Sequence, residues 1–228
     1  MEKERVRERI FEIGIVPVVR ASSPREAKIA AEAVYEGGIP MVEITLTVPG
    51  AVELIRELRR NGPSQVLVGA GTVLDVQEAR RCIDAGAQFL VSPGLDLPTV
   101  EVAVQERILM IAGALTPTEI VSAWRAGADL VKVFPCGLVG GAKYIKALKG
   151  PLPQIPLVPA GGVNLNTAAD FLKAGAAALG IGGELVQPEA LKSGKPEIIA
   201  GIARKFLEVV KNARARMGSP GLTAKSLG

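Results

Sequence analysis

A lysine in the middle of an apolar run is the residue of this chain with the clearest chemical potential. Lys132 lies in Leu130-Val131-Lys132-Val133-Phe134-Pro135, and turn residues bound the run on both sides, so it predicts a buried strand. Burial of an unpaired ammonium is costly and favours the neutral amine. A neutral lysine amine in a pocket is a nucleophile toward carbonyl carbon, which makes Lys132 a candidate for covalent catalysis.

A carboxylate interrupts a second apolar run in a similar way. In Met41-Val42-Glu43-Ile44-Thr45-Leu46, strand alternation places Glu43 and Thr45 on one face and the apolar residues Val42, Ile44 and Leu46 on the other. We expect the polar face to line an interior that it shares with Lys132. Two interpretations follow for Glu43: a group that moves protons beside the lysine, or one half of a structural ion pair.

Two further residues stand at the ends of strand-like runs. Arg20 follows Val18 by two positions, and Thr72 follows Ala70 by two positions, so strand parity directs both toward the same mouth as Glu43 and Lys132. Arginine and threonine side chains suit a carboxylate group. Each residue taken alone could instead be an ordinary loop-edge residue.

Glycine pairs end two later runs, at Ala160-Gly161-Gly162 and at Gly180-Ile181-Gly182-Gly183. Turns without side chains let an anion approach the backbone N–H groups, so these pairs indicate a phosphate site. The predicted phosphate-binding residues are Gly161, Gly162, Gly182 and Gly183. The alternative is that the glycines only allow tight exits from the strands.

The elements that must position these residues recur along the chain. Strand-like runs alternate with segments of helical periodicity, and about eight are recognisable, at 16–20, 41–46, 66–72, 89–93, 109–115, 129–135, 157–162 and 177–183. Eight such units with an extra N-terminal helix predict an α/β fold, a (β/α)8 TIM barrel, with the site at the carboxyl ends of the strands. A doubly wound open sheet is the alternative, but no GxGxxG follows the first run.

Length and composition agree with one barrel. We expect residues 1–228 to form a single domain, with about 212–228 as a loose C-terminal tail. The chain is 48% hydrophobic and 22% charged, without an apolar stretch that would span a membrane or a signal-peptide pattern, which predicts a soluble cytoplasmic protein. A net charge of +4 with only 4% aromatic residues does not favour nucleic acid as a partner.

The absence of histidine narrows the chemistry. It removes Ser-His-Asp and Cys-His nucleophile systems and histidine-ligated metal sites, and the two cysteines, Cys82 and Cys136, form no CxxC pattern. The remaining chemistry needs no metal and no other cofactor. The amine of Lys132 would attack a ketone, and the resulting iminium ion would draw electrons from the adjacent carbon–carbon bond while Glu43 moves protons.

Five motifs carry a resemblance to a known family. They are Val42-Glu43-Ile44-Thr45-Leu46-Thr47, Val68-Gly69-Ala70-Gly71-Thr72-Val73-Leu74, Val91-Ser92-Pro93-Gly94, Lys132-Val133-Phe134-Pro135 and Pro159-Ala160-Gly161-Gly162-Val163. In this order they resemble the 2-keto-3-deoxy-6-phosphogluconate (KDPG) aldolases, class I lyases that include 4-hydroxy-2-oxoglutarate (KHG) aldolase activity. The resemblance implies a barrel, a homotrimer, and cleavage of the sugar acid to pyruvate and glyceraldehyde 3-phosphate.

The same resemblance implies roles for individual residues. Lys132 matches the Schiff-base lysine and Glu43 the general acid/base. The substrate-binding positions implied by the motifs are Arg20, Thr72, Pro93, Phe134, Thr45, Thr47 and Ala160. The four glycines named above fall where the phosphate binds.

Three positions depart from the common pattern of the family. Some members have arginine at the position of Thr47, many have threonine at Ala160, and serine is common at Gly183. Because position 47 is not arginine here, we expect Arg20 to bind the substrate carboxylate. Ala160 bears on the choice of substrate epimer. Other readings stay open: a 2-dehydro-3-deoxy-6-phosphogalactonate aldolase, a sugar-phosphate isomerase or epimerase, and a non-catalytic phosphate-binding barrel.

Overall fold

Eight parallel strands form the centre of the molecule and curve into a barrel. The structure is a computed structural model that describes residues 3–218. The strands are β1 (Ile15–Val19), β2 (Met41–Thr45), β3 (Leu67–Gly71), β4 (Phe89–Val91), β5 (Leu109–Ala114), β6 (Leu130–Val133), β7 (Leu157–Pro159) and β8 (Leu179–Ile181). They pair in the order β7-β6-β5-β4-β3-β2-β1-β8, and a parallel bridge between Ala160 and Gly180 joins the two ends. The predicted (β/α)8 TIM barrel is confirmed.

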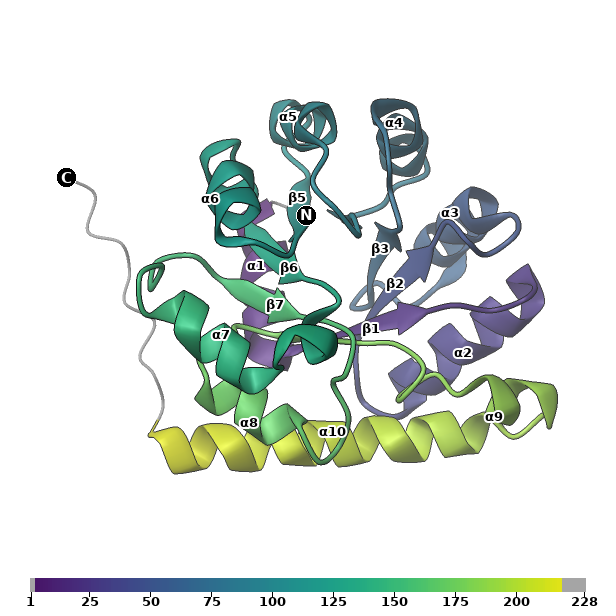
Figure 1. Cartoon of the computed structure of the whole chain (residues 1–228). Coiled ribbons are helices and arrows are strands. Elements are labelled where there is room, and N and C mark those ends of the chain that lie inside the picture. Colours follow the sequence, from purple (N-terminus) through teal and green to yellow (C-terminus); the bar gives the residue numbers. More distant parts are fainter. Residues whose placement is uncertain (1–2, 219–228) are drawn as a thin grey trace.

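The helices surround the strands (Figure 1). They are α1 (Lys3–Ile13), α2 (Pro24–Glu36), α3 (Ala51–Asn61), α4 (Val76–Asp84), α5 (Leu97–Gln105), α6 (Pro117–Arg125), α7 (Ala142–Lys149), α8 (Ala168–Lys173), α9 (Pro188–Lys192) and α10 (Pro196–Met217), with a 3₁₀ turn, η1 (Cys136–Val139), after β6. No helix within residues 3–218 is long and apolar enough to cross a membrane.

Each predicted run overlaps one strand, and several runs extend beyond it at the carboxyl end. Arg20, Thr72 and Phe134 all lie just past the last residue of their strand. These three residues therefore stand at the mouth, just beyond their strands, whereas Lys132 and Glu43 lie within β6 and β2.

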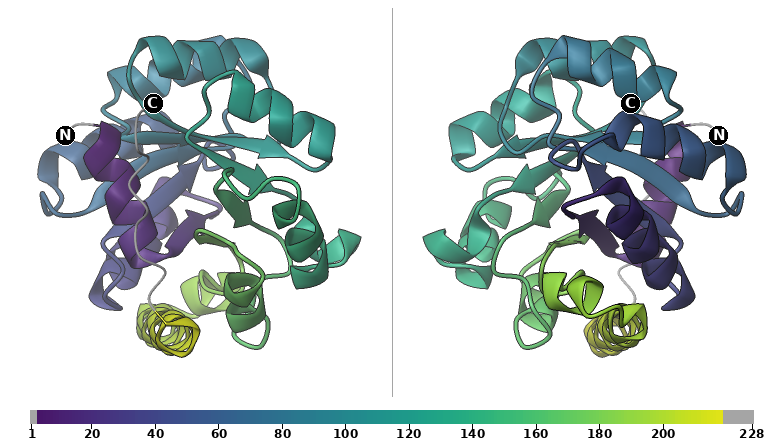
Figure 2. Two further views of the ribbon diagram at one scale, coloured as in Figure 1. Left: turned by 90° about the vertical axis from the view of Figure 1, so that its left-hand side faces the viewer. Right: turned by 90° about the vertical axis from the view of Figure 1, so that its right-hand side faces the viewer.

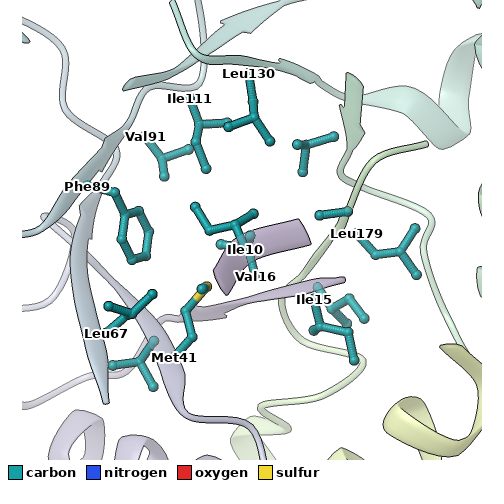
Figure 3. Close-up of a cluster of buried hydrophobic side chains, with 14 of the residues drawn as sticks. Ile10, Ile15, Val16, Met41, Leu67, Phe89, Val91, Ile111, Leu130 and Leu179 are labelled. Carbon is teal, nitrogen blue, oxygen red and sulfur yellow. The ribbon is translucent and has the colours of Figure 1, made fainter. Parts of the chain in front are cut away.

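The extra helix closes the opposite end of the barrel. Ile10 of α1 is fully buried and lies among lumen side chains such as Met41, Phe89 and Leu130 (Figure 3). Lys3 at the start of this helix forms an ion pair with Asp129, at 2.9 Å, just before β6. Because α1 fills the amino-terminal end of the lumen, only the carboxyl-terminal mouth is left for a ligand.

The last helix differs from the expected loose tail. Helix α10 runs to Met217, along the outside of the barrel against α2 and α8 (Figures 1 and 2). Ala213 is buried, and the Arg214 guanidinium donates to the carbonyl oxygens of Phe11 and Glu12 at 2.6 Å each. These contacts with the end of α1 hold residues 212–217 in the helix. Residues 219–228 of the predicted tail lie outside the described residues.

Candidate active site

The predicted lysine and glutamate meet inside the barrel. Lys132 on β6 and Glu43 on β2 are 5% and 1% exposed, and the Nζ and Oε1 atoms are 4.0 Å apart. Strands β3, β4 and β5 separate β2 from β6 along the sheet, so the two side chains approach each other across the lumen. The charged groups are therefore neighbours only because the sheet closes.

The carboxylate of Glu43 is poorly satisfied. Oε1 is a buried oxygen without a hydrogen-bond partner, the only such side-chain atom among residues 3–218. Burial raises the pKa of Glu43 above its ordinary value, and the positive charges of Lys132 and Arg20 offset part of this effect. A carboxyl group with a raised pKa and an open acceptor oxygen is suited to take up and release a proton.

Two glycines outside the predicted set make room for the pair. A Cβ atom on Gly71 would collide with the carboxylate of Glu43, and a Cβ on Gly113, the neighbour of Lys132 in the sheet, would collide with the backbone of Pro93. A glycine within an otherwise apolar strand indicates such a close approach, so the sequence contained a signal for both positions. These residues shape the site without carrying chemistry.

The ring of Phe134 and the side chain of Pro93 lie on the same side of the mouth as Lys132. The Nζ atom of Lys132 is 5.5 Å from the centre of the Phe134 ring. Pro93 and Phe134 are both half-buried, at the ends of β4 and β6. The structure thus brings both predicted packing residues to the lysine side of the mouth.

Arg20 and Thr72 reach the mouth as well. Arg20 is exposed, but its charge acts on Glu43, and its Nη1 atom lies 3.2 Å from where a Cβ on Gly182 would be. Thr72 has a φ of 60°, a left-handed conformation that costs a β-branched residue about 1–3 kcal/mol. Such strain is common where a side chain is held for binding.

Thr45, the last residue of β2, and Thr47, two positions beyond it, form a chain of two hydroxyl groups. Thr45 is fully buried, and its Oγ1 donates to the carbonyl oxygen of Val19 at 3.0 Å. The Oγ1 atoms of Thr45 and Thr47 are 2.7 Å apart, and Thr47 is exposed. Thr45 thus connects β2 to β1, while Thr47 is open to the mouth.

The predicted phosphate residues lie at the exits of β7 and β8. Gly161 and Gly162 have φ values of 78° and 84°, which only glycine adopts freely. Gly183 has open space where a Cβ would be, and Gly182 lies beside Arg20. The sheet places these four glycines together because Ala160 and Gly180 pair at the barrel seam.

Ala160 itself faces the interior. It follows Val158, the sheet neighbour of Lys132, by two positions and is 4% exposed. A Cβ on Gly180 would lie 2.9 Å from the Cβ of Ala160. The small residue on β8, Gly180, therefore accommodates the side chain at position 160.

Residues 3–218 contain no group of three or more His, Cys, Asp or Glu side chains arranged to hold a metal ion.

The fold and the site together define the class, a (β/α)8-barrel aldolase of the lysine-dependent type, and comparison with known proteins agrees. KHG/KDPG aldolase of Escherichia coli strain K12 is 36% identical over 198 residues, which are 86% of this chain and 92% of that protein. The 2-dehydro-3-deoxy-phosphogluconate aldolase of Dickeya dadantii is 36% identical over 84% of this chain and 89% of its own length.

Solved structures show the same similarity. KDPG aldolase from Legionella pneumophila, with pyruvate captured as a covalent carbinolamine, superposes with a TM-score of 0.81 at 29% identity, over 86% of this chain and 96% of that one. The sequence model of the "KDPG and KHG aldolase" family matches residues 6–202. The chain belongs to the KDPG and KHG aldolase family.

Proposed function

We propose that this protein cleaves 2-dehydro-3-deoxy-6-phosphogluconate to pyruvate and glyceraldehyde 3-phosphate, with Lys132 as the Schiff-base residue and Glu43 as the general acid/base. The second activity in this proposal is cleavage of 4-hydroxy-2-oxoglutarate to pyruvate and glyoxylate. The observation that carries the proposal is the buried ion pair of Lys132 and Glu43. Its Nζ and Oε1 atoms are 4.0 Å apart, and Oε1 accepts no hydrogen bond. A purely structural pair would gain little from leaving that oxygen unsatisfied.

The chemistry balances with these two side chains. The amine of Lys132 attacks the C2 ketone to give a carbinolamine, and protonation of its hydroxyl by Glu43 releases water and leaves an iminium ion. Glu43 then takes the proton of the C4 hydroxyl while the C3–C4 bond breaks, and the electron pair moves to the enamine. Protonation at C3 and addition of water release pyruvate and restore the amine.

The surrounding residues hold the two ends of the substrate in this proposal. Arg20 and Thr72 bind the keto-acid carboxylate, and Pro93 and Phe134 pack against the pyruvyl part. The phosphate lies on the backbone N–H groups of the two glycine pairs. The left-handed glycines at the exit of β7 and the open space at Gly183 support this assignment.

Borohydride trapping tests the covalent step. Incubation with pyruvate and borohydride is expected to leave a reduced adduct on the peptide that contains Lys132, as found by mass spectrometry. Lys132→Met should lose the adduct and all measurable cleavage while it keeps its far-UV circular dichroism. Lys146→Met, at an exposed lysine of α7, is the matched control and should retain both. Turnover without an adduct on Lys132 would contradict the proposal.

The epimeric phosphogalactonate is the second candidate substrate. A relative of Rhizobium meliloti, named as a probable 2-dehydro-3-deoxy-6-phosphogalactonate aldolase, is 31% identical over 76% of this chain, and Ala160 lacks the hydroxyl common in KDPG aldolases. Values of kcat/KM for the two epimers and for 4-hydroxy-2-oxoglutarate would decide between them.

Position 160 supports a prediction about the choice of epimer. Ala160→Thr is expected to sharpen discrimination between the two epimers, because it adds a hydroxyl group on the interior face next to the neighbour of Lys132. The ratio of kcat/KM values for the epimers measures the effect. An unchanged ratio would refute a role of this position in selectivity.

We also propose a homotrimer in the cytoplasm, on the basis of the family resemblance and the sequence composition. Sedimentation velocity of the full chain measures the assembly. A monomer or dimer at micromolar concentration would refute the trimer without affecting the proposed chemistry.

A further inference from the structure

Backbone hydrogen bonds hold one side of the turn that follows β7. The N–H groups of Cys136 and Gly137, in η1, donate to the carbonyl oxygens of Ala160 and Gly161 at 2.9 and 2.7 Å. The two segments also touch through their backbones, because a Cβ atom on Gly137 would lie 2.9 Å from the Cα atom of Gly162. The turn is therefore held against the exit of β6.

A side chain holds the next peptide group of the turn. The Oγ1 atom of Thr167, the residue before α8, donates to the carbonyl oxygen of Gly162 at 3.0 Å and accepts from the N–H of Asn164 at 2.9 Å. The carbonyl oxygen of Asn164 lies farther from the same hydroxyl group, at 3.4 Å. Because a hydroxyl group has one hydrogen to donate, the shorter contact takes it. Thr167 thus directs the Gly162 carbonyl toward the start of α8.

These contacts determine where the N–H groups of the turn point. The peptide bonds of the turn are trans, so each N–H points opposite to the carbonyl of the preceding residue. The Gly161 carbonyl faces η1, so the N–H of Gly162 points away from β6, toward the exit of β8 on the other side of β7. The Gly162 carbonyl faces Thr167, so the N–H of Val163 points away from α8. Neither N–H group has an acceptor within residues 3–218.

We propose that Thr167 is a positioning residue for the phosphate-binding turn, which keeps the Gly162 carbonyl oxygen turned away from the anion and the Val163 N–H turned toward it. The inference rests on the proposed function, in which the substrate phosphate lies on the glycine pairs. It adds a residue that contacts neither the substrate nor Lys132.

The turn needs such an anchor because of its glycines. Gly162 has a φ of 84°, and a glycine lets the peptide group that follows it rotate at little cost. A rotated group would present its carbonyl oxygen to the phosphate and repel it, whereas an N–H group attracts it. The hydrogen bond from Thr167 opposes this rotation.

Two substrates that differ only in the phosphate group isolate the effect. Values of kcat and KM are measured for 2-dehydro-3-deoxy-6-phosphogluconate and for 2-dehydro-3-deoxygluconate. Thr167→Val should lower the kcat/KM ratio of the first to the second by about 3- to 10-fold, the effect of one hydrogen bond. The change should appear in KM, because the phosphate is remote from the bond that breaks. Thr167→Ser keeps the hydroxyl group and should preserve the ratio.

Thr116→Val is the matched control. Thr116 also immediately precedes a helix, α6, and its hydroxyl group accepts from the N–H of Glu119 at 3.3 Å, within the start of that helix. This variant should lose stability in urea and keep the ratio of the two substrates. An equal fall of the ratio in both valine variants would mean that the effect is not specific to the turn, and would overturn the inference.

Amide NMR of the unaltered protein gives a test that depends on no variant. Titration with inorganic phosphate should shift the signals of Val163, Gly162 and Gly183. Shifts of the two glycines without a shift of Val163 would contradict the inference, as would an unchanged substrate ratio in Thr167→Val. Both results leave the proposed cleavage standing. Absence of cleavage and of a Lys132 adduct in the unaltered protein refutes the proposed function, whereas a shift of Val163 that is lost in Thr167→Val still supports the role of Thr167.

Discussion

At the scale of single residues, Glu43 is an acidic side chain buried inside the barrel. It is 1% exposed, and its Oε1 oxygen has no hydrogen bond within residues 3–218. Burial raises its pKa, while the charges of Lys132 and Arg20 act in the opposite direction. Burial thus favours the protonated form of Glu43 more than water does, and a carboxyl group with a raised pKa is suited to general acid/base catalysis.

This residue predicts a pH dependence of stability. Because the pKa of Glu43 is raised in the folded state, the folded protein binds more protons than the unfolded chain between the unfolded pKa, about 4.3, and the folded pKa. The stabilisation is complete below the unfolded pKa and is lost as the pH rises through the folded pKa. Glu43→Gln does not titrate, so its free energy of unfolding relative to the unaltered protein should increase with pH, by up to about 1.4 kcal/mol per pH unit.

Urea denaturation between pH 4 and pH 8 measures this difference, and the same variant should lose about 10²- to 10⁴-fold in kcat. Glu53→Gln, in the first turn of α3, is the control and should show no comparable trend. A relative stability that falls as the pH rises would mean that the ion pair, not burial, dominates the pKa of Glu43.

At the scale of elements, the barrel depends on contacts between its first and last helices. Ile10 of helix α1 lies in the amino-terminal end of the lumen. Arg214 of α10 donates hydrogen bonds to the carbonyl oxygens of Phe11 and Glu12 at the end of α1. Those carbonyls have no partners within the helix, so the guanidinium satisfies them and carries a favourable charge at the helix terminus. The contact holds the closing helix in place at the end of the barrel opposite the site.

Arg214→Ala is expected to destabilise the protein by about 1–3 kcal/mol, because two charge-assisted hydrogen bonds are lost. Turnover of the folded variant should be unchanged, since the mouth is at the other end of the barrel. Urea denaturation and steady-state kinetics test the two statements. Arg216→Ala, an exposed arginine in the same helix, is the control; an equal loss in both variants would rule out the specific contact.

At the scale of the whole molecule, the barrel has one weak seam. Strands β7 and β8 are joined by the bridge between Ala160 and Gly180 and by the bond from the Ala177 N–H to the Leu157 carbonyl, whereas β2 and β3 pair over their full length. The phosphate glycines lie at this seam. A site at the place of weakest pairing can adjust to a ligand at little cost in ladder bonds.

Hydrogen exchange tests this view. Backbone amides at the exits of β7 and β8 should exchange faster than those of β2 and β3. Bound inorganic phosphate should slow exchange selectively at the β7–β8 seam. Peptide-resolved mass spectrometry, with inorganic phosphate as the probe, measures both effects. Uniform protection around the barrel would contradict the existence of a weak seam.

The pattern of residues was enough to predict the strands, the barrel and the inward faces of Glu43 and Lys132. Strand alternation and the recurrence of βα units are local properties of the chain, so they can be read without coordinates. The expected loose tail was wrong for residues 212–217, which continue helix α10. This polar segment is held by Arg214, which contacts Phe11, a residue distant in the sequence.

Only the tertiary structure decided the relations between distant residues. Closure of the sheet brings β2 and β6 to face each other and sets the 4.0 Å distance between Lys132 and Glu43. It also leaves Glu43 Oε1 without a partner and joins the Thr45 hydroxyl group to the carbonyl oxygen of Val19. Sequence determines which side chains face inward because that depends on local periodicity. Their partners depend on the closure of the barrel, which no local pattern contains.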